Sequence, residues 1–398
     1  MLPFFTNLLI LLIAARLLGE LFERFKQPSM IGEIIAGIVL GPSLFGLISL
    51  TEDINVISEL GVFLLVISAG LEINVDDIVR SIRGKNIYIT ILAFFIPFVL
   101  GLAVGAIFKL GVTSSIFIGL CISITALPIS VRILMDLGIL NTDIGKKILS
   151  AAIFEDVLAL AFFGFILNAR NTDMTFLSIA KTVGWSALKL AMFLVILAVA
   201  YFFSKKISKR HNYIENWLDR FLEILKGKES LFALFFVFVL IFATITETLG
   251  FHFIIGAFFA ALLINKNIVG ENNLNTIQTS TNGLSMGFLS PIFFASIGLE
   301  FNIISIKHIW LLLVVVIMSY FSKILGGFLG GRLAKLPSNA SLSIGIGLNA
   351  RGIMELVIAN IAFKEGMINS ELFSILVVMG VLTTITTPFM LKWSLRKK

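Results

Sequence analysis

Five ionisable residues lie inside otherwise apolar stretches of the sequence, and chemistry is expected at these positions. Glu155 and Asp156 are adjacent, Lys323 lies alone in a second stretch, and Arg351 and Glu355 share a third. An ionised carboxylate at the centre of a membrane helix costs about 3 kcal/mol on insertion scales, so such groups usually bind, pair with or move ions.

Helical spacing predicts how these side chains pair. Neighbours on a helix point about 100° apart, so Glu155 and Asp156 can face different partners. Lys323 has no acid in its own stretch, and the acid pair is its expected partner; the alternative is a lysine that reaches to the membrane surface. Arg351 and Glu355 are four residues apart, which predicts an ion pair on one helix face that holds a broken helix in shape.

The charges of the five groups predict the kind of ligand. Three acids and two bases leave the site with a net charge of one negative, which suits a monovalent cation or a proton. The single cysteine and three histidines form no transition-metal motif, and Ca²⁺ would need more carboxylates. The sequence has no nucleophile–base pair and no cofactor motif, so we expect neither an enzyme nor a bound cofactor.

The composition predicts that membrane helices position these residues. Of 398 residues, 58% are hydrophobic and 14% are charged, against about 25% charged in a typical soluble domain. These values exclude a soluble enzyme and a nucleic-acid-binding domain. Long unbroken apolar runs also exclude a transmembrane β-barrel, whose strands alternate apolar and polar residues.

The apolar runs predict an all-α membrane protein with about 13 transmembrane helices. The predicted spans are residues 4–24, 28–46, 53–74, 86–109, 113–136, 142–168, 176–204, 228–247, 250–266, 279–300, 304–334, 339–365 and 369–393. The polar stretch 205–227 predicts an amphipathic helix on the membrane surface, with Trp217, Phe221 and Leu225 on one side. Two overlapping G-x-x-x-G spacings in 326–331 predict close helix packing.

The positions of Lys and Arg predict the orientation. With these spans, 22 of the 31 Lys and Arg residues lie on one side of the membrane and 4 on the other. Cytoplasmic loops retain positive charge. The N-terminus is therefore expected outside and the C-terminus in the cytoplasm, in a cytoplasmic (inner) membrane.

A short internal repeat predicts two related halves. Ser68–Asn74 and Ser296–Asn302 agree at five of seven positions, 228 residues apart. They lie seven helices apart, so they point in opposite directions through the membrane, as in the inverted repeats of secondary transporters. Chance similarity between apolar segments is the alternative. The predicted organisation is one transmembrane domain over 1–398, with approximate inverted repeats at 28–168 and 250–393 and a linker helix with interfacial segment at 176–227.

Two positions predict interrupted helices near the middle of the membrane. Pro128 lacks an N–H and crowds the carbonyl of Ile124, beside the hydroxyl of Thr125. The repeat offset leads from Pro128 to a glycine-rich run that contains Asn349 and Arg351. Broken backbone is tolerated in a membrane only where it lines a cavity or binds something. The alternative is an ordinary proline kink with glycines for helix packing.

The sequence resembles the cation:proton antiporter-2 family, which has NapA-like and Kef-like members. The resemblance covers essentially the whole chain and rests on Pro28–Pro42, Thr125–Arg132, the central acid pair, Lys323 and Asn349–Glu355. It implies a sodium/proton antiporter fold with two crossed discontinuous helices, a separate homodimer interface and elevator-like transport.

The same resemblance implies roles for individual residues. Asp156 would be the main cation and proton carboxylate, Glu155 would face Lys323, and Thr125 would lie at the crossing. Family members with sodium/proton exchange usually have Asp-Asp at the acid pair and Kef-type members Gln-Asp. The Glu-Asp pair retains a titratable first acid, which favours the former. We expect no C-terminal nucleotide-binding domain of the Kef type.

These features together predict a secondary active transporter that exchanges Na⁺ or K⁺ for protons by alternating access. Proton and cation compete for Asp156, and only an occupied site has its charge compensated enough to cross the hydrophobic barrier. Release of a second proton from Lys323 is a further hypothesis, because burial disfavours the charged amine. A Kef-type potassium efflux channel or transporter without strict proton coupling, and a sodium-coupled organic-anion symporter, stay open as alternatives.

Overall fold

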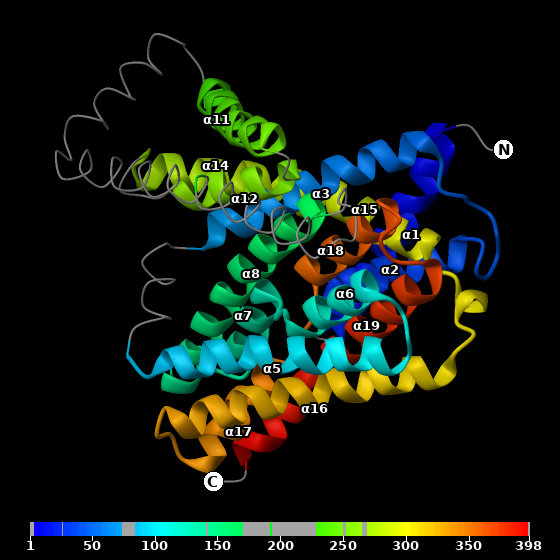
Figure 1. Ribbon diagram of the computed structural model, residues 1–398. Coiled ribbons are helices and arrows are strands. Elements are labelled where there is room, and N and C mark those ends of the chain that lie inside the picture. The colour runs from blue at the N-terminus through cyan, green and yellow to red at the C-terminus, as the bar shows by residue number, and fades with distance from the viewer. Residues whose placement is uncertain are drawn as a thin grey trace. The chain divides into compact units, whose positions relative to one another are not determined.

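A computed structural model describes residues 4–25, 27–73, 84–140, 142–169, 192, 228–249, 252–264 and 269–396, and this part of the chain is helical without strands (Figure 1). The α-helices are α1 (Phe4–Arg24), α2 (Ser29–Leu40), α3 (Glu52–Glu72), α5 (Asn86–Ile107), α6 (Val112–Ser123), α7 (Leu127–Asp136), α8 (Asp143–Ala169), α11 (Lys228–Thr248), α12 (Phe253–Leu263), α14 (Glu271–Leu284), α15 (Ser290–Glu300), α16 (Ile309–Leu333), α17 (Ser338–Gly347), α18 (Ile353–Lys364) and α19 (Ser370–Arg396). Seven described helical segments are long and apolar enough to cross a membrane. The predicted all-α membrane class is confirmed.

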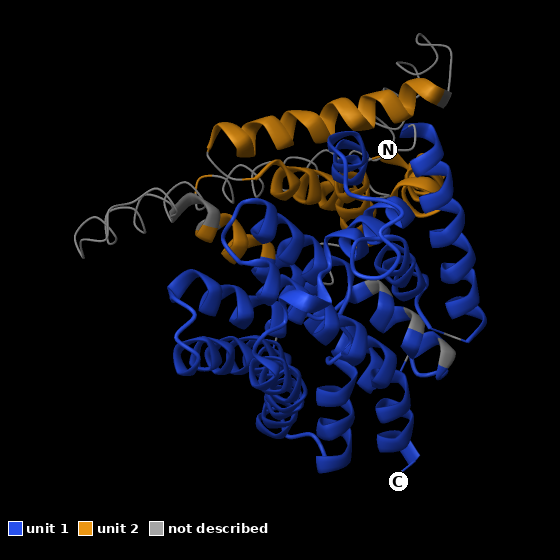
Figure 2. Cartoon of the chain, turned by 90° about the vertical axis from the view of Figure 1, so that its right-hand side faces the viewer, with its two compact units in different colours: residues 1–60, 76–159, 290–398 blue, residues 61–75, 160–289 orange. Residues whose placement is uncertain are grey.

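The chain divides into two compact units (Figure 2). Unit 1 comprises residues 1–60, 76–159 and 290–398, and unit 2 comprises 61–75 and 160–289. Every candidate site residue of the sequence analysis belongs to unit 1. Within unit 2, the Gln278 side chain donates to the Leu71 carbonyl at 2.9 Å and so ties α14 to the end of α3.

The predicted span 279–300 begins too late. The structure starts α14 at Glu271 and continues it through a π-helical turn, η1 (Ser285–Leu289), into α15. The residues of α14 are mostly polar, so hydropathy does not mark them, although the helix buries Ile277 and Thr281. The predicted span 176–204 and the interfacial segment 205–227 lie outside the described residues, apart from residue 192.

Two predicted spans are interrupted, as expected. The span 113–136 becomes α6 and α7, and the span 339–365 becomes α17 and α18. The first break precedes Pro128, which occupies the first turn of α7. A proline there sacrifices no helical hydrogen bond, because the N–H groups of a first turn have no partner within the helix.

The same order of elements occurs twice in the chain. A long helix, a broken helix and another long helix follow one another as α5 to α8 and again as α16 to α19. The two last helices, α8 and α19, have 27 residues each. This order places each break between two long helices.

Glycines bring α16 against two neighbours at once. A Cβ atom on Gly326 would lie 2.5 Å from the Leu92 carbonyl oxygen of α5, and one on Gly327 would lie 2.4 Å from Cα of Gly345 in α17. One turn later, Gly330 faces α5 and Gly331 faces α17 in the same way. The predicted G-x-x-x-G packing is present, and it fixes the helix that carries Lys323.

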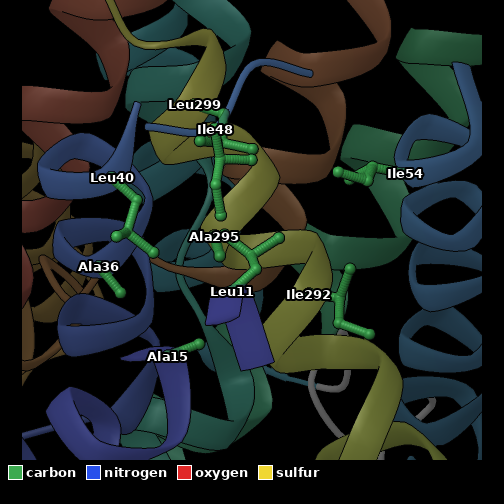
Figure 3. Close-up of a cluster of buried hydrophobic side chains, with 9 residues drawn as sticks. All are labelled: Leu11, Ala15, Ala36, Leu40, Ile48, Ile54, Ile292, Ala295 and Leu299. Atoms are coloured by element: carbon green, nitrogen blue, oxygen red, sulfur yellow. The ribbon is translucent and has the colours of Figure 1, made fainter. Parts of the chain in front are cut away.

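A second part of unit 1 is held by apolar side chains (Figure 3). The buried cluster joins α1, α2, α15 and the start of α3, and its members are Leu11, Ala15, Ala36, Leu40, Ile48, Ile54, Ile292, Ala295 and Leu299. Small residues again allow close approach, because a Cβ on Gly37 would lie 1.9 Å from the Ala295 carbonyl oxygen. The cluster lies around α2, whose sequence carries part of the family resemblance.

Replacing Gly327 by Ala is expected to destabilise the protein by roughly 1–3 kcal/mol, because the added methyl group displaces the backbone of α17. The measurement is the thermal unfolding midpoint in detergent. Gly283→Ala in α14 is the matched control, since its Cβ would meet no atom within 4 Å and Ala favours a helix by up to about 1 kcal/mol. Equal destabilisation by both changes would contradict the packing role.

Candidate functional site

The two helix breaks lie against each other. The first runs over residues 124–126 and the second over residues 348–352. The Ala126 amide donates to the Ala350 carbonyl at 2.8 Å, and the Thr125 hydroxyl donates to the Leu348 carbonyl at 2.5 Å. Each break therefore satisfies backbone groups of the other, which water cannot do inside a membrane.

Lys323 connects α16 to the acid pair and to the first break. Its Nζ donates to Oε2 of Glu155 at 2.8 Å, and both side chains are 0% exposed. It also donates to the carbonyls of Ala93, at 3.1 Å, and Ser123. An ammonium has three N–H donors, so three acceptors match the charged form of Lys323.

The acid pair keeps two unpartnered oxygens. Glu155 and Asp156 are neighbours on α8 and are 0% and 2% exposed. Oε1 of Glu155 and Oδ1 of Asp156 have no hydrogen-bond partner. Burial of an unpaired carboxylate is costly, so these oxygens are suited to take up a cation or a proton.

The predicted ion pair between Arg351 and Glu355 is wrong. Arg351 lies in the second break and not one helical turn before Glu355, because α18 begins only at Ile353. Its guanidinium donates to three carbonyls instead, those of Ile124 at 2.5 Å, Cys121 at 3.3 Å and Ser319 at 3.4 Å. Neither oxygen of Glu355 has a hydrogen-bond partner.

Arg351 fills the first break with positive charge. The carbonyls of Cys121 and Ile124 belong to the end of α6 and the residue after it, where helical partners are missing. A guanidinium carries five N–H donors in a rigid fork, and it supplies donors at this point. The backbone carbonyl of Arg351 accepts a hydrogen bond from the Thr384 hydroxyl at 2.6 Å, which links the second break to α19.

Asn349 is the remaining polar side chain of the second break. It is 1% exposed, and neither its Oδ1 nor its Nδ2 has a partner. Its neighbours Leu348 and Ala350 accept the two bonds across the crossing. Asn349 thus directly follows the residue that accepts the Thr125 hydroxyl, and Thr125 also borders the Glu155 carboxylate.

Three contacts at the site were not predicted from the sequence. The carbonyls of Ala93 and Ser123 hold Lys323, and Thr384 holds the backbone of Arg351. Backbone acceptors leave no mark in a sequence. The four threonines at 383, 384, 386 and 387 in α19 are a signal that could have drawn attention to Thr384.

The arrangement defines a class of protein. Two broken helices cross inside an apolar helical unit, and buried carboxylate and amide oxygens without partners lie beside them. Among the described residues, no group of three or more His, Cys, Asp and Glu side chains could hold a metal ion. This is the architecture of a membrane protein that moves small ions across the bilayer.

Comparison with known proteins identifies the family. Residues 8–397 match the model of the sodium/hydrogen exchanger family, transmembrane region. The chain is 29% identical over 401 residues to the Na⁺/H⁺-K⁺ antiporter GerN of Bacillus cereus, covering 99% of this chain and 97% of GerN. It is 30% identical over 411 residues to the Na⁺/H⁺ antiporter NhaS4 of Synechocystis, covering 97% and 96%. The chain belongs to the sodium/hydrogen exchanger family.

A solved structure agrees with the fold. The sodium proton antiporter MjNhaP1 of Methanocaldococcus jannaschii superimposes with a TM-score of 0.69 at 16% identity, covering 98% of this chain and 95% of MjNhaP1. The predicted sodium/proton antiporter fold is confirmed.

Replacing Lys323 by Met is expected to cost roughly 3–5 kcal/mol of stability, because it leaves Glu155 buried without its counter-charge. The double variant Lys323→Met/Glu155→Gln should recover most of that loss. Thermal unfolding in detergent measures both.

The exposed pair Arg24–Glu20 provides the control for this prediction. Nε of Arg24 lies 3.9 Å from Oε1 of Glu20, and the two side chains are 76% and 57% exposed, respectively. Arg24→Ala should change stability by less than about 1 kcal/mol. Additive losses in the Lys323 and Glu155 double variant would show that the two groups are not coupled.

Proposed function

We propose that this chain exchanges a monovalent cation, Na⁺ or K⁺, for protons by alternating access, with both ligands competing for Asp156. The observation that carries the proposal is the unpartnered, buried Oδ1 of Asp156 beside two crossed helix breaks. Membership of the sodium/hydrogen exchanger family supports the same activity.

Competition follows from the cost of burying charge. An empty, ionised Asp156 is an uncompensated buried anion and resists movement through an apolar barrier. A proton or a cation removes that penalty, and one occupant excludes the other. The loaded site therefore changes sides while the empty site does not, which couples the two gradients.

Each neighbour has a proposed role. Lys323 compensates Glu155 and so couples the pair, leaving Asp156 as the acid that exchanges its occupant. Glu155 and Thr125 complete the ion-binding set. Pro128, Asn349 and Arg351 support the broken helices.

The other possible activities have less support. A potassium channel without proton coupling disagrees with the names of GerN and NhaS4, both antiporters. A sodium-coupled symporter of organic anions would need a substrate cavity with more polar lining than the described residues of the site offer.

The membrane location, the oligomeric state and the orientation are proposed from the sequence. We place the protein in the cytoplasmic membrane as a homodimer, with the N-terminus outside and the C-terminus inside. The repeats at 28–168 and 250–393, the linker at 176–227 and the finer assignment to the cation:proton antiporter-2 family belong to the same proposal. The repeated order of elements and the family motifs support it.

The decisive experiment is ion-driven pH change in proteoliposomes. Addition of Na⁺, K⁺ or Li⁺ to one side should move protons in the wild-type protein for at least one cation, and Asp156→Asn should abolish the signal. Asp143→Asn is the matched control on the same helix, because Asp143 is 77% exposed. Cation flux without proton movement would instead support the channel.

Competition also predicts a pH dependence with a definite sign. Lowering the pH on the cation side fills Asp156 with protons, so the apparent KM for the cation should rise by up to about tenfold per pH unit for each competing proton. The maximal rate at saturating cation should change less. A KM that stays constant through the acidic range would argue against a shared carboxylate.

A further inference from the structure

Glu355 is a buried acid that the proposed exchange cycle does not use. It is 0% exposed in the first turn of α18, and both carboxylate oxygens lack a hydrogen-bond partner. Its oxygens face Gly380 of α19, where an added Cβ would lie 3.5 Å from each. An ionised carboxylate in this position would have no hydrogen-bond donor from the described residues to compensate it.

Neither nearby cation donates a hydrogen bond to Glu355 in this arrangement. Arg351 on the second break and Lys323 on α16 are the charged groups that act on it, and Cys121 on α6 is the titratable neutral neighbour. Lys323 uses its donors on Glu155 and two carbonyls. Arg351 directs both terminal nitrogens to carbonyls, and its Nε has no partner.

This pattern of donors assigns the protons. Lys323 is matched as an ammonium by three acceptors, whereas no donor compensates a negative charge on the buried Glu355, which favours its neutral form. We propose that Glu355 holds a second exchangeable proton of the transport site and that the Arg351 guanidinium controls its release. The inference rests on the proposed cation/proton exchange and names a proton carrier other than Lys323.

The step is a simple proton transfer. When a cation occupies the crossing, its charge competes with Arg351 for the break carbonyls of Cys121 and Ile124. The guanidinium then turns its unused Nε–H toward Glu355, and the carboxyl group loses its proton to water on the open side of the membrane. The O–H bond of Glu355 breaks and an ion pair with Arg351 forms, so charge is conserved.

The test counts protons released when a cation binds, without requiring transport. Isothermal titration calorimetry in buffers of different ionisation enthalpy gives this number for purified protein, with Na⁺, K⁺ and Li⁺ as the probes. We expect Glu355→Gln to release about one proton fewer per cation than the wild type. In proteoliposomes, the cation KM of Glu355→Gln should also depend less steeply on pH than that of the wild type. The change in KM per pH unit should be smaller by a factor of about ten.

Two variants make the result specific. Glu300→Gln is the matched control, because Glu300 is another largely buried acid of unit 1 but accepts a bond from Asn360 at 2.6 Å, and it should leave the proton count unchanged. Glu355→Asp keeps an ionisable group and should restore the wild-type count, even where Glu355→Gln is too unstable to purify.

The outcomes separate this inference from the proposed function. Equal proton counts for wild type and Glu355→Gln, or a reduced count in Glu355→Asp, would overturn the role of Glu355 alone. A wild-type protein that binds a cation but releases no proton would overturn the exchange proposal itself. A loss of about one proton in Glu355→Gln, restored in Glu355→Asp and absent in Glu300→Gln, supports the second proton site.

Discussion

The structure depends on how two interrupted helices satisfy their backbone groups in an apolar interior. A helix end leaves several N–H and C=O groups without partners, and lipid supplies no replacement. The breaks therefore face each other, with Ala126 bonded to Ala350 and Thr125 to Leu348. Arg351 and Lys323 supply the remaining donors to carbonyls around α6. Glycines of α16 pack it closely against α5 and α17, and from this helix Lys323 contacts the carbonyls of Ala93 and Ser123.

The same requirement leaves the acids short of partners. Both cations spend donors on backbone carbonyls, and four carboxylate oxygens of the three acids have no hydrogen-bond partner: Oε1 of Glu155, Oδ1 of Asp156 and both oxygens of Glu355. In a site that binds anions, the basic side chains would point their donors at the ligand. Here the cations fasten the scaffold and the acids remain available, which is the distribution that a cation and proton carrier needs.

The sequence was sufficient for the large features of this fold. Apolar length gave the helices, Pro128 and the glycine-rich run gave the two breaks, and an isolated Lys323 pointed to the acid pair. Helical spacing failed at Arg351 and Glu355, because a break between them removes the i, i+4 relation. Hydropathy failed at α14, a polar helix that continues into an apolar one. Contacts to carbonyls could not be predicted, since every residue carries one and only the tertiary structure selects among them.

The failure at Arg351 is informative about how the site works. An arginine paired with Glu355 would have been a fixed structural bridge, whose two charges satisfy each other in every state. An arginine bonded to three neutral carbonyls is held by weaker, dipolar interactions. In the proposed step, a cation that enters the crossing competes for the same oxygens. In the proposed step Glu355 receives the displaced guanidinium, and the positive charge beside it favours loss of the Glu355 proton. The wrong sequence prediction and the observed geometry are thus two arrangements of one pair, and a cation that favours one over the other links its own binding to proton release.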